Sequence, residues 1–162
     1  MSQKTTVPTT LLDNLHELIA FADELYQKLV LVVGPAGSGK TYLLQELAAT
    51  LAVPVHNVNL EMSQQLLGFG ERERTLKGQT LLQELVAQAE GKIVLLDNTE
   101  LLFHRQFRWQ PLPMLQSCAR EKTVVAAWHG QIQKGYLIYA EPPHPDYRRE
   151  PIRDVLTISL EP

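Results

Sequence analysis

The residues best suited to chemistry stand at positions 34–41, where GPAGSGKT fits the phosphate-loop pattern G-x-x-x-x-G-K-[ST] in full. The segment lies between an apolar run and a stretch that favours a helix, which is the context that this pattern requires. Glycines let the backbone approach a polyphosphate, while Lys40 would meet its β- and γ-phosphates and the Thr41 hydroxyl would bind Mg²⁺. The segment therefore predicts a site for Mg²⁺ and for ATP, or ADP after turnover. The predicted nucleotide-binding residues are Gly34, Pro35, Ala36, Gly37, Ser38, Gly39, Lys40, Thr41 and Tyr42.

A second candidate ends the apolar run KIVLLD at residues 92–97. In open parallel sheets the ligand lies at the carboxyl ends of the strands, so we expect Asp97 beside the phosphate loop. There it would hold Mg²⁺ directly or through water. The alternative is that Asp97 caps a following helix, and the two roles are compatible.

The spacing of apolar residues predicts the elements that must position these groups. Apolar runs predict strands at 29–33, 53–60, 92–97, 123–128 and 154–160. Apolar residues at helical spacing predict helices at 10–26, 42–51, 61–67, 80–89 and 111–120. The expected architecture is one three-layer α/β domain over residues 10–162, with about five mostly parallel strands and helices on both faces.

The remaining segments are predicted to be irregular or short. Residues 1–9 are expected to be a flexible tail, and residues 68–79, which are glycine-rich and charged, an exposed loop. Residues 135–140 suggest a short hairpin arm, whereas the prolines of residues 141–151 predict an irregular segment. Pro54, near the start of the second strand, argues that this strand lies at an edge of the sheet or that the proline stands at its entry.

The composition restricts the class of protein. The 162 residues leave room for one domain. No apolar run reaches the length of a membrane span and no secretory signal is visible, so we expect a cytoplasmic protein without a membrane partner. The net charge of −3 gives no overall attraction for nucleic acid, and any contact with DNA, weak or indirect, would need a local basic patch.

Two short basic stretches are candidates for such a patch. The first holds Arg72, Arg74 and Lys77, and the second holds His104, Arg105 and Arg108. Phe107 and Trp109, in the second stretch, could stack on bases. The alternative for each stretch is a solvated surface or a contact with a partner protein.

The chain resembles the small P-loop ATPase of type 3 BREX (bacteriophage exclusion) systems over most of its length. The resemblance rests on the phosphate loop and KIVLLDNTELLF, together with HNVNLEMS, TVVAAWHG and YAEPPHPDYRRE. Only the two nucleotide motifs carry assignable chemistry. The resemblance implies a cytoplasmic bacterial protein, encoded with a DNA methyltransferase, an alkaline-phosphatase-like protein and a larger ATPase, that acts against phage DNA. The chain also looks like a reduced AAA-type core, without room for the C-terminal helical lid that usually follows.

The AAA-type pattern places a glutamate directly after the magnesium aspartate, and here that position holds Asn98. An amide can orient a water molecule but cannot accept its proton, which predicts slow hydrolysis or a different base. If the chain stays extended past Asp97, residues 98 and 100 share a face and Glu100 could reach the same water. Alternatively, Glu100 is a first-turn helix acid favoured by the helix dipole. The candidate catalytic residues are Lys40, Asp97, Asn98 and Glu100.

Two further roles have candidates. His129, after the fourth predicted strand, could sense the nucleotide, since that strand should lie beside the third. An arginine from a neighbouring subunit often stabilises the leaving group. The candidates for it are Arg148, Arg149 and Arg153, followed by Arg105 and Arg108.

The sequence leaves two functions open. One is a Mg²⁺-dependent ATPase that works as a homo-oligomer or with other defence-system proteins. The other is a nucleotide-binding interaction module with little or no hydrolysis, in which ATP orders an interface, and Asn98 favours it. A small-molecule kinase is disfavoured, because residues 68–79 would serve poorly as its arginine-bearing lid.

Overall fold

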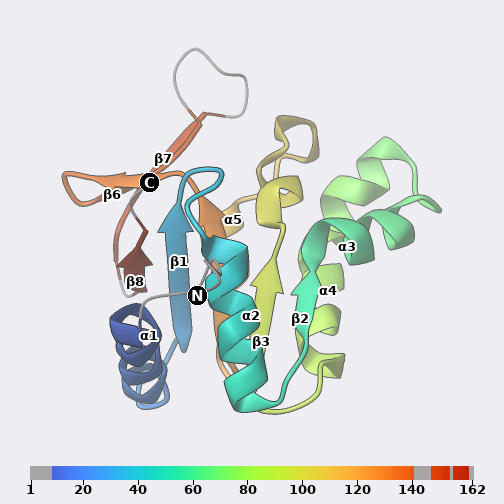
Figure 1. Ribbon diagram of the computed structural model, residues 1–162. Helices are drawn as coiled ribbons and strands as arrows, with labels where there is room; N and C mark the ends of the chain where they lie inside the picture. Colours follow the sequence, from blue (N-terminus) through green and yellow to red (C-terminus); the bar gives the residue numbers. More distant parts are fainter. Residues whose placement is uncertain (1–8, 141–146, 154, 161–162) are drawn as a thin grey trace.

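Five apolar segments form one parallel sheet in the computed structural model, which describes residues 9–140, 147–153 and 155–160. The strand order is β2-β3-β4-β1-β8, and every neighbouring pair is parallel. The strands are β1 (Leu29–Gly34), β2 (Val55–Asn57), β3 (Ile93–Asp97), β4 (Thr123–His129) and β8 (Leu156–Ser159). The predicted sheet of about five mostly parallel strands is confirmed. Figure 1 shows the strands pointing the same way, so their carboxyl ends meet at one edge.

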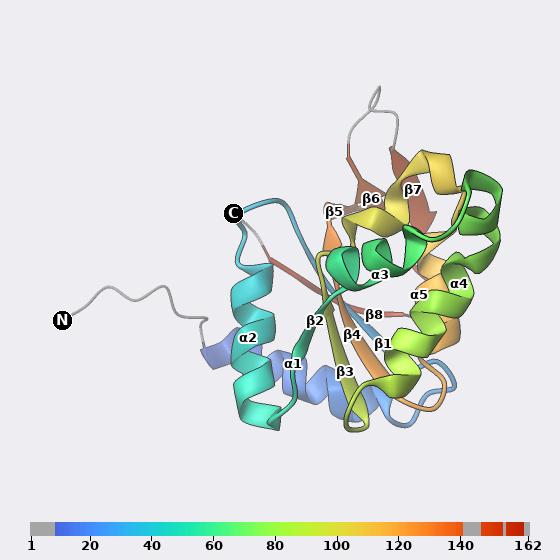
Figure 2. The ribbon, with the colours of Figure 1, turned by 90° about the vertical axis from the view of Figure 1, so that its right-hand side faces the viewer.

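Helices cover both faces of this sheet, as the three-layer prediction required. α1 (Thr9–Ala22) and α2 (Lys40–Leu51) pack on one face. α3 (Val58–Leu66), α4 (Glu71–Gln88) and α5 (Pro111–Cys118) pack on the other. Figure 2, turned by 90°, shows the two helical layers on opposite sides of the strands. Among the described residues, no helix is both long enough and apolar enough to cross a bilayer.

The first helix differs slightly from its prediction. It starts at Thr9, one residue inside the expected tail, and ends at Ala22 rather than near Tyr26. Tyr26 is 75% exposed and contributes nothing to the apolar stripe that would extend the helix. Residues 1–8, the rest of the expected tail, lie outside the described part of the chain.

A second, antiparallel sheet follows β4 at the carboxyl edge of the first (Figure 1). Its strands are β5 (Gln131–Gln133), β6 (Tyr136–Tyr139) and β7 (Arg148–Pro151). The hairpin arm expected at 135–140 corresponds to β6, but the irregular segment expected at 141–151 is wrong over β7. Pro151 is accommodated because it ends an edge strand, where a missing N–H need not break a ladder. Residues 141–146 lie outside the described residues.

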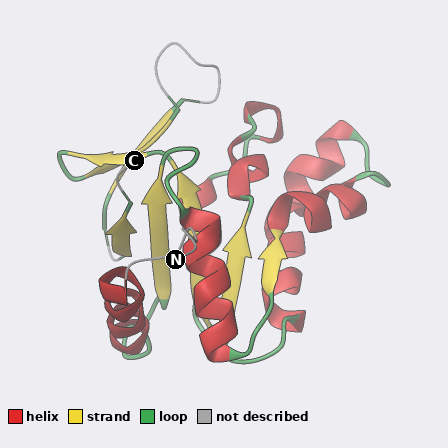
Figure 3. Ribbon diagram, in the orientation of Figure 1, coloured by secondary structure: helices red, strands yellow, loops and turns green. Residues whose placement is uncertain are grey.

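The exposed loop expected at residues 68–79 is wrong, because α4 already begins at Glu71 and runs unbroken to Gln88 (Figure 3). Glu71 and Glu73 occupy its first turn, where acidic side chains complement the helix dipole. Gly78, within the helix, makes room for the indole of Trp109, since an added Cβ would lie 2.2 Å from that ring. Here glycine marks close packing rather than a turn.

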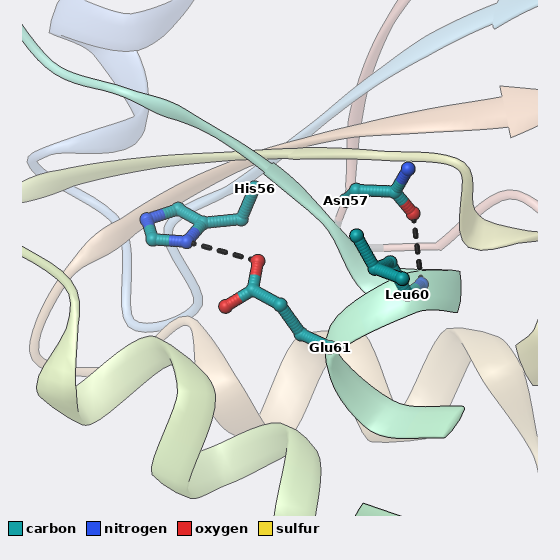
Figure 4. Close-up of polar contacts among 4 residues, drawn as sticks. All are labelled: His56, Asn57, Leu60 and Glu61. Carbon is teal, nitrogen blue, oxygen red and sulfur yellow. Dashed lines mark hydrogen bonds and ion pairs between the residues drawn. The ribbon is translucent and has the colours of Figure 1, made fainter. Parts of the chain in front are cut away.

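The second predicted strand is shorter than expected. β2 ends at Asn57, whose side-chain oxygen accepts a hydrogen bond from the Leu60 N–H at 2.9 Å and so caps α3 (Figure 4). Nδ1 of His56, one residue earlier, lies 3.3 Å from Oε2 of Glu61 in that helix. The expectation from Pro54 holds, because β2 forms an edge of the parallel sheet.

Two short 3₁₀ helices, η1 (Thr99–Phe103) and η2 (Arg105–Phe107), connect β3 to α5. The ring of Phe103 stacks on Tyr139 of β6 with centroids 3.8 Å apart and meets the edge of Trp128 of β4 at 4.7 Å. These aromatic contacts join the segment after β3 to the second sheet.

Candidate functional site

The phosphate-loop segment connects the end of β1 to the start of α2, at the carboxyl edge of the parallel sheet (Figure 1). Gly37 and Gly39 have φ angles of 76° and 101°, which glycine adopts without steric cost. No side chain caps the N-terminus of α2. The first N–H groups of a helix lack intrahelical partners and carry partial positive charge, so this end of α2 can bind an anion.

Lys40, the first residue of α2, folds back over the loop. Its Nζ donates to the backbone oxygens of Gly34 at 2.6 Å and Pro35 at 2.9 Å. Burial lowers the pKa of Lys40, and the carboxylates of Glu100 and Asp97 oppose that shift. A phosphate oxygen is a stronger acceptor than a carbonyl, so this amino group can donate to a bound phosphate instead.

Thr41 lies on α2, which follows β1, and Asp97 ends β3, yet the two residues meet although β4 lies between β1 and β3 in the sheet. The Thr41 hydroxyl donates to Asp97 Oδ2 at 2.7 Å, and Asp97 Oδ1 accepts the Asn98 N–H at 2.8 Å. Asp97 is 6% exposed, which makes it one of the few buried polar residues of the described chain. A hydroxyl and a carboxylate are hard oxygen ligands of the kind that Mg²⁺ prefers.

The described residues contain no cluster of three or more His, Cys, Asp or Glu side chains that could hold a metal ion. In nucleotide sites Mg²⁺ is held by one or two protein oxygens together with substrate phosphates and water. The cap role considered for Asp97 is not observed, because Asn98 occupies the cap position of η1 and no side chain caps it.

The chain does not stay extended past Asp97, so the geometry expected for Glu100 is wrong. Asn98 is left-handed, with φ 53° and ψ 55°, and η1 follows at once. The buried hydroxyl of Thr99 donates to the Ala127 oxygen at 2.6 Å, which ties the turn to β4. Packing of η1 on β4 and the second sheet therefore overrides continuation of the strand.

Glu100 lies in the first turn of η1, three residues after Asp97, whose carboxylate accepts the Thr41 hydroxyl of the loop. Burial lowers the pKa values of both Lys40 and His129, and the Glu100 carboxylate opposes that shift in each. His129 ends β4 opposite Gly34, and its pKa is lowered by burial and by the charge of Lys40. Of the predicted site residues, the structure thus brings together Lys40, Thr41, Asp97, Glu100 and His129.

The predicted arginines lie elsewhere. Arg148 of β7 donates from Nη2 to the Trp109 oxygen at 3.0 Å, and its Nε is buried without a partner. Arg149 is exposed, with its guanidinium 3.7 Å from the centre of the Tyr136 ring. Arg153 is also exposed. Within the described residues, no hydrogen bond or ion pair joins these three arginines to the phosphate loop.

The two basic stretches come together on one surface. Arg72 of α4 and Arg108 after η2 line a cleft of about 540 Å³. The expected stacking of bases on Phe107 and Trp109 is wrong, because these rings are only 6% and 4% exposed. They pack against each other, with centroids 4.3 Å apart, inside the domain.

Sequence reasoning missed Thr99 and Asn59, which hold the turn after β3. The Asn59 N–H donates to the Asn98 oxygen at 3.0 Å, and the Thr99 hydroxyl bonds to β4. Neither residue stands in a pattern with a known spacing, so the sequence carried no signal for them.

The model of the AAA family, the ATPase family associated with various cellular activities, matches residues 30–124. SH1500, an uncharacterized protein of Staphylococcus haemolyticus, is 35% identical over 85 residues. That match covers 46% of this chain and 31% of the relative, so the chain spans about a third of the relative's length.

Solved structures with a similar arrangement include PCH-2 of C. elegans, with 20% identity and a TM-score of 0.47 over 77% of this chain and 38% of that chain. AMPPCP-bound DnaA from Aquifex aeolicus is 18% identical, with a TM-score of 0.45 over 98% of this chain and 51% of that chain. Drosophila ORC bound to DNA is 17% identical, with a TM-score of 0.45 over 92% and 41% of the two chains. Likenesses at this level carry no information about function.

Proposed function

Since the chain belongs to the AAA family of ATPases, we propose that it binds ATP with Mg²⁺ and hydrolyses it slowly or when activated by a partner. The observation that carries this proposal is the hydrogen bond between the Thr41 hydroxyl and the Asp97 carboxylate at 2.7 Å. It joins the predicted magnesium ligands of two separate motifs beside Lys40 and the uncapped N-terminus of α2.

Binding would use the backbone and charges of the loop. The first N–H groups of α2 would donate to phosphate oxygens, and Lys40 would transfer its hydrogen bonds from Gly34 and Pro35 to the β- and γ-phosphates. Thr41 and Asp97 would hold Mg²⁺, which when bound neutralises charge on the phosphates. The residues present fit that ion because both offer oxygen atoms at the carboxyl edge of the sheet.

Hydrolysis would use Glu100 as the general base. Its carboxylate would accept a proton from water while the water oxygen forms a bond to the γ-phosphorus. The bond from that phosphorus to the bridging oxygen breaks, and ADP and inorganic phosphate result. The position of Glu100 in the first turn of η1, three residues after Asp97, supports this assignment. His129 would detect the γ-phosphate from the end of β4.

The direct test is Glu100→Gln, which keeps shape but cannot accept the proton. Turnover, measured as phosphate release, should fall by about 10²–10⁴-fold, the usual share of general-base catalysis. ATP affinity should stay close to that of the wild type, which separates this variant from Lys40→Ala, expected to lose binding itself. Unchanged turnover in Glu100→Gln would remove Glu100 from the mechanism.

The second candidate function is a nucleotide-binding interaction module. Asn98 in the position usual for glutamate favours it. Binding of ATP and ADP, phosphate release and size in solution should be measured together, with and without DNA. Binding without release would support the module, and release that rises with protein concentration would support an ATPase completed by a second subunit.

For that completing arginine we favour Arg149 over Arg148. Arg149 is exposed on β7 and held by the Tyr136 ring, whereas the guanidinium of Arg148 already donates to the Trp109 oxygen. A homo-oligomer in which Arg149 reaches a neighbouring loop would be inactive when dilute. Arg149→Ala should then lower release at high protein concentration without changing ATP affinity.

The biological setting rests on the sequence resemblance to the small ATPase of type 3 BREX systems. We propose that the chain acts in the bacterial cytoplasm with other defence-system proteins against phage, with at most weak or indirect contact with DNA. Replacing Lys40 by Ala in a host that carries the complete system should abolish protection, measured as the efficiency of phage plating. Full protection by that variant would contradict the proposal.

A further inference from the structure

Asn98 has a left-handed backbone conformation and an exposed side chain. Its φ of 53° and ψ of 55° lie in the left-handed region, which glycine, asparagine and aspartate enter far more readily than other residues. The side chain is exposed and makes no hydrogen bond with any described residue. The backbone of this residue, rather than its amide, is therefore what the structure uses.

Three hydrogen bonds hold the left-handed turn at Asn98. The Asn98 N–H donates to the Asp97 carboxylate at 2.8 Å, and the Asn98 oxygen accepts the Asn59 N–H at 3.0 Å. The next residue, Thr99, is fixed to the Ala127 oxygen at 2.6 Å. With both neighbours fixed, a residue that resists the left-handed conformation must break at least one of these bonds.

The turn decides where Glu100 lies. Because the chain turns at Asn98, Glu100 enters the first turn of η1, three residues after Asp97. Asp97 is itself joined to the loop, since its Oδ2 accepts the Thr41 hydroxyl at 2.7 Å. An extended chain would continue the direction of β3 instead. Glu100 therefore stands two positions beyond the one that usually holds the glutamate in this family.

We propose that Asn98 is a positioning residue, whose left-handed backbone directs the Glu100 carboxylate to the phosphate loop, and that its amide takes no part in the reaction. The effect on turnover rests on the proposed function, because it requires Glu100 to be the base. The placement of Glu100 beside His129 does not rest on it.

Two substitutions separate backbone from amide. Asn98→Gly removes the amide and keeps the left-handed conformation accessible, whereas Asn98→Val places a β-branched side chain where that conformation is strongly disfavoured. If the backbone matters, Asn98→Gly should keep phosphate release within about threefold of the wild type. The rate of phosphate release of Asn98→Val should fall about 100-fold or more, toward the rate of Glu100→Gln. If the amide orients the attacking water, Asn98→Gly should fall as far as Asn98→Val, which would overturn the proposal.

A second readout does not depend on turnover. The pKa of His129 can be followed by NMR titration of its imidazole. Burial and the charge of Lys40 lower this pKa, and the Glu100 carboxylate opposes them, so the pKa responds to the position of Glu100. Glu100→Gln should lower this pKa. Asn98→Val should lower it equally, and Asn98→Gly should leave it at the wild-type value. A value in Asn98→Gly that matches Glu100→Gln, or one in Asn98→Val that matches the wild type, would overturn the proposal.

The two readouts distinguish the two claims. In one outcome, the variants show the expected order of His129 pKa values while the wild type releases no phosphate. That result would support the positioning role of Asn98 and contradict the proposed hydrolysis. In another outcome, the wild type releases phosphate while Asn98→Gly, rather than Asn98→Val, lowers the pKa of His129. That result would contradict the positioning role alone. Should Asn98→Val fail to fold, Asn98→Ala, which resists the left-handed region less, takes its place in both measurements.

Discussion

Two stretches, residues 34–41 and 68–79, each contain three glycines, yet most of the first forms a loop and most of the second forms a helix. In the first, Gly37 and Gly39 adopt φ angles of 76° and 101°, and an added Cβ would meet nothing within 4 Å. In the second, Gly78 lies in the regular helix α4, and an added Cβ would lie 2.2 Å from Trp109. Glycine is required by backbone conformation in the loop and by space in the helix.

The difference explains why one stretch was predicted and the other was not. A conformational requirement belongs to the segment itself, so it leaves a recognisable pattern such as that of the phosphate loop. A requirement for space belongs to the partner, and Trp109 lies 31 positions away from Gly78 in the chain. Substitutions at these glycines can therefore test the contrast.

The largest effect is expected for Gly39→Ala. A side chain at φ 101° costs about 1–3 kcal/mol, so the loop must distort and the N–H groups of α2 turn away from the phosphates. The Kd for ATP should rise about 10- to 100-fold, which is the same energy expressed as affinity. Isothermal titration calorimetry would measure it, and wild-type affinity would show that the loop does not need this conformation.

Gly78→Ala should instead reduce stability and leave ATP affinity unchanged. Forcing a methyl group against the Trp109 indole costs about 1–3 kcal/mol, of which the better helix propensity of alanine returns up to about 1 kcal/mol. For a chain of this size, Tm should fall by about 2–4 °C for each kcal/mol lost. A Tm equal to or above that of the wild type would show that α4 can move away from the indole.

Lowering the pH should reduce the stability of the fold through protonation of His129. Its pKa in the folded chain is lowered, first by burial and then by Lys40, so the unfolded chain binds the proton more readily. Stability should therefore fall as the pH drops below about 6.5, the ordinary value of histidine. His129→Gln should flatten this part of the pH profile in thermal unfolding, and an unchanged slope would assign it to other groups.

The smallest effect is expected for Gly68→Ala, the matched control for the other two glycines. Gly68 has no left-handed φ, and an added Cβ would meet nothing within 4 Å. Stability should change by no more than about 0.5 kcal/mol, and ATP affinity should be unaffected. A large loss in thermal unfolding would mean that the linker between α3 and α4 has a role that neither conformation nor space explains.

Much of the fold was accessible from the sequence because its signals are local. The apolar runs that became β1, β3 and β4 are long and continuous, as central strands require, and their bounds were predicted within a residue or two. Edge elements were predicted less well. Val58 has strand propensity, yet it begins α3 because Asn57 caps that helix.

The site divides along the same line. The sequence by itself determined the phosphate loop, because its chemistry depends on residues that are adjacent in the chain. It also indicated Asp97, through the rule that parallel strands end at one edge. Only the tertiary structure decided how Glu100 reaches that edge, since the left-handed turn at Asn98 is imposed by Asn59 and Ala127, which are distant in sequence. Hydrogen bonds and packing between separate elements leave no pattern in either one alone.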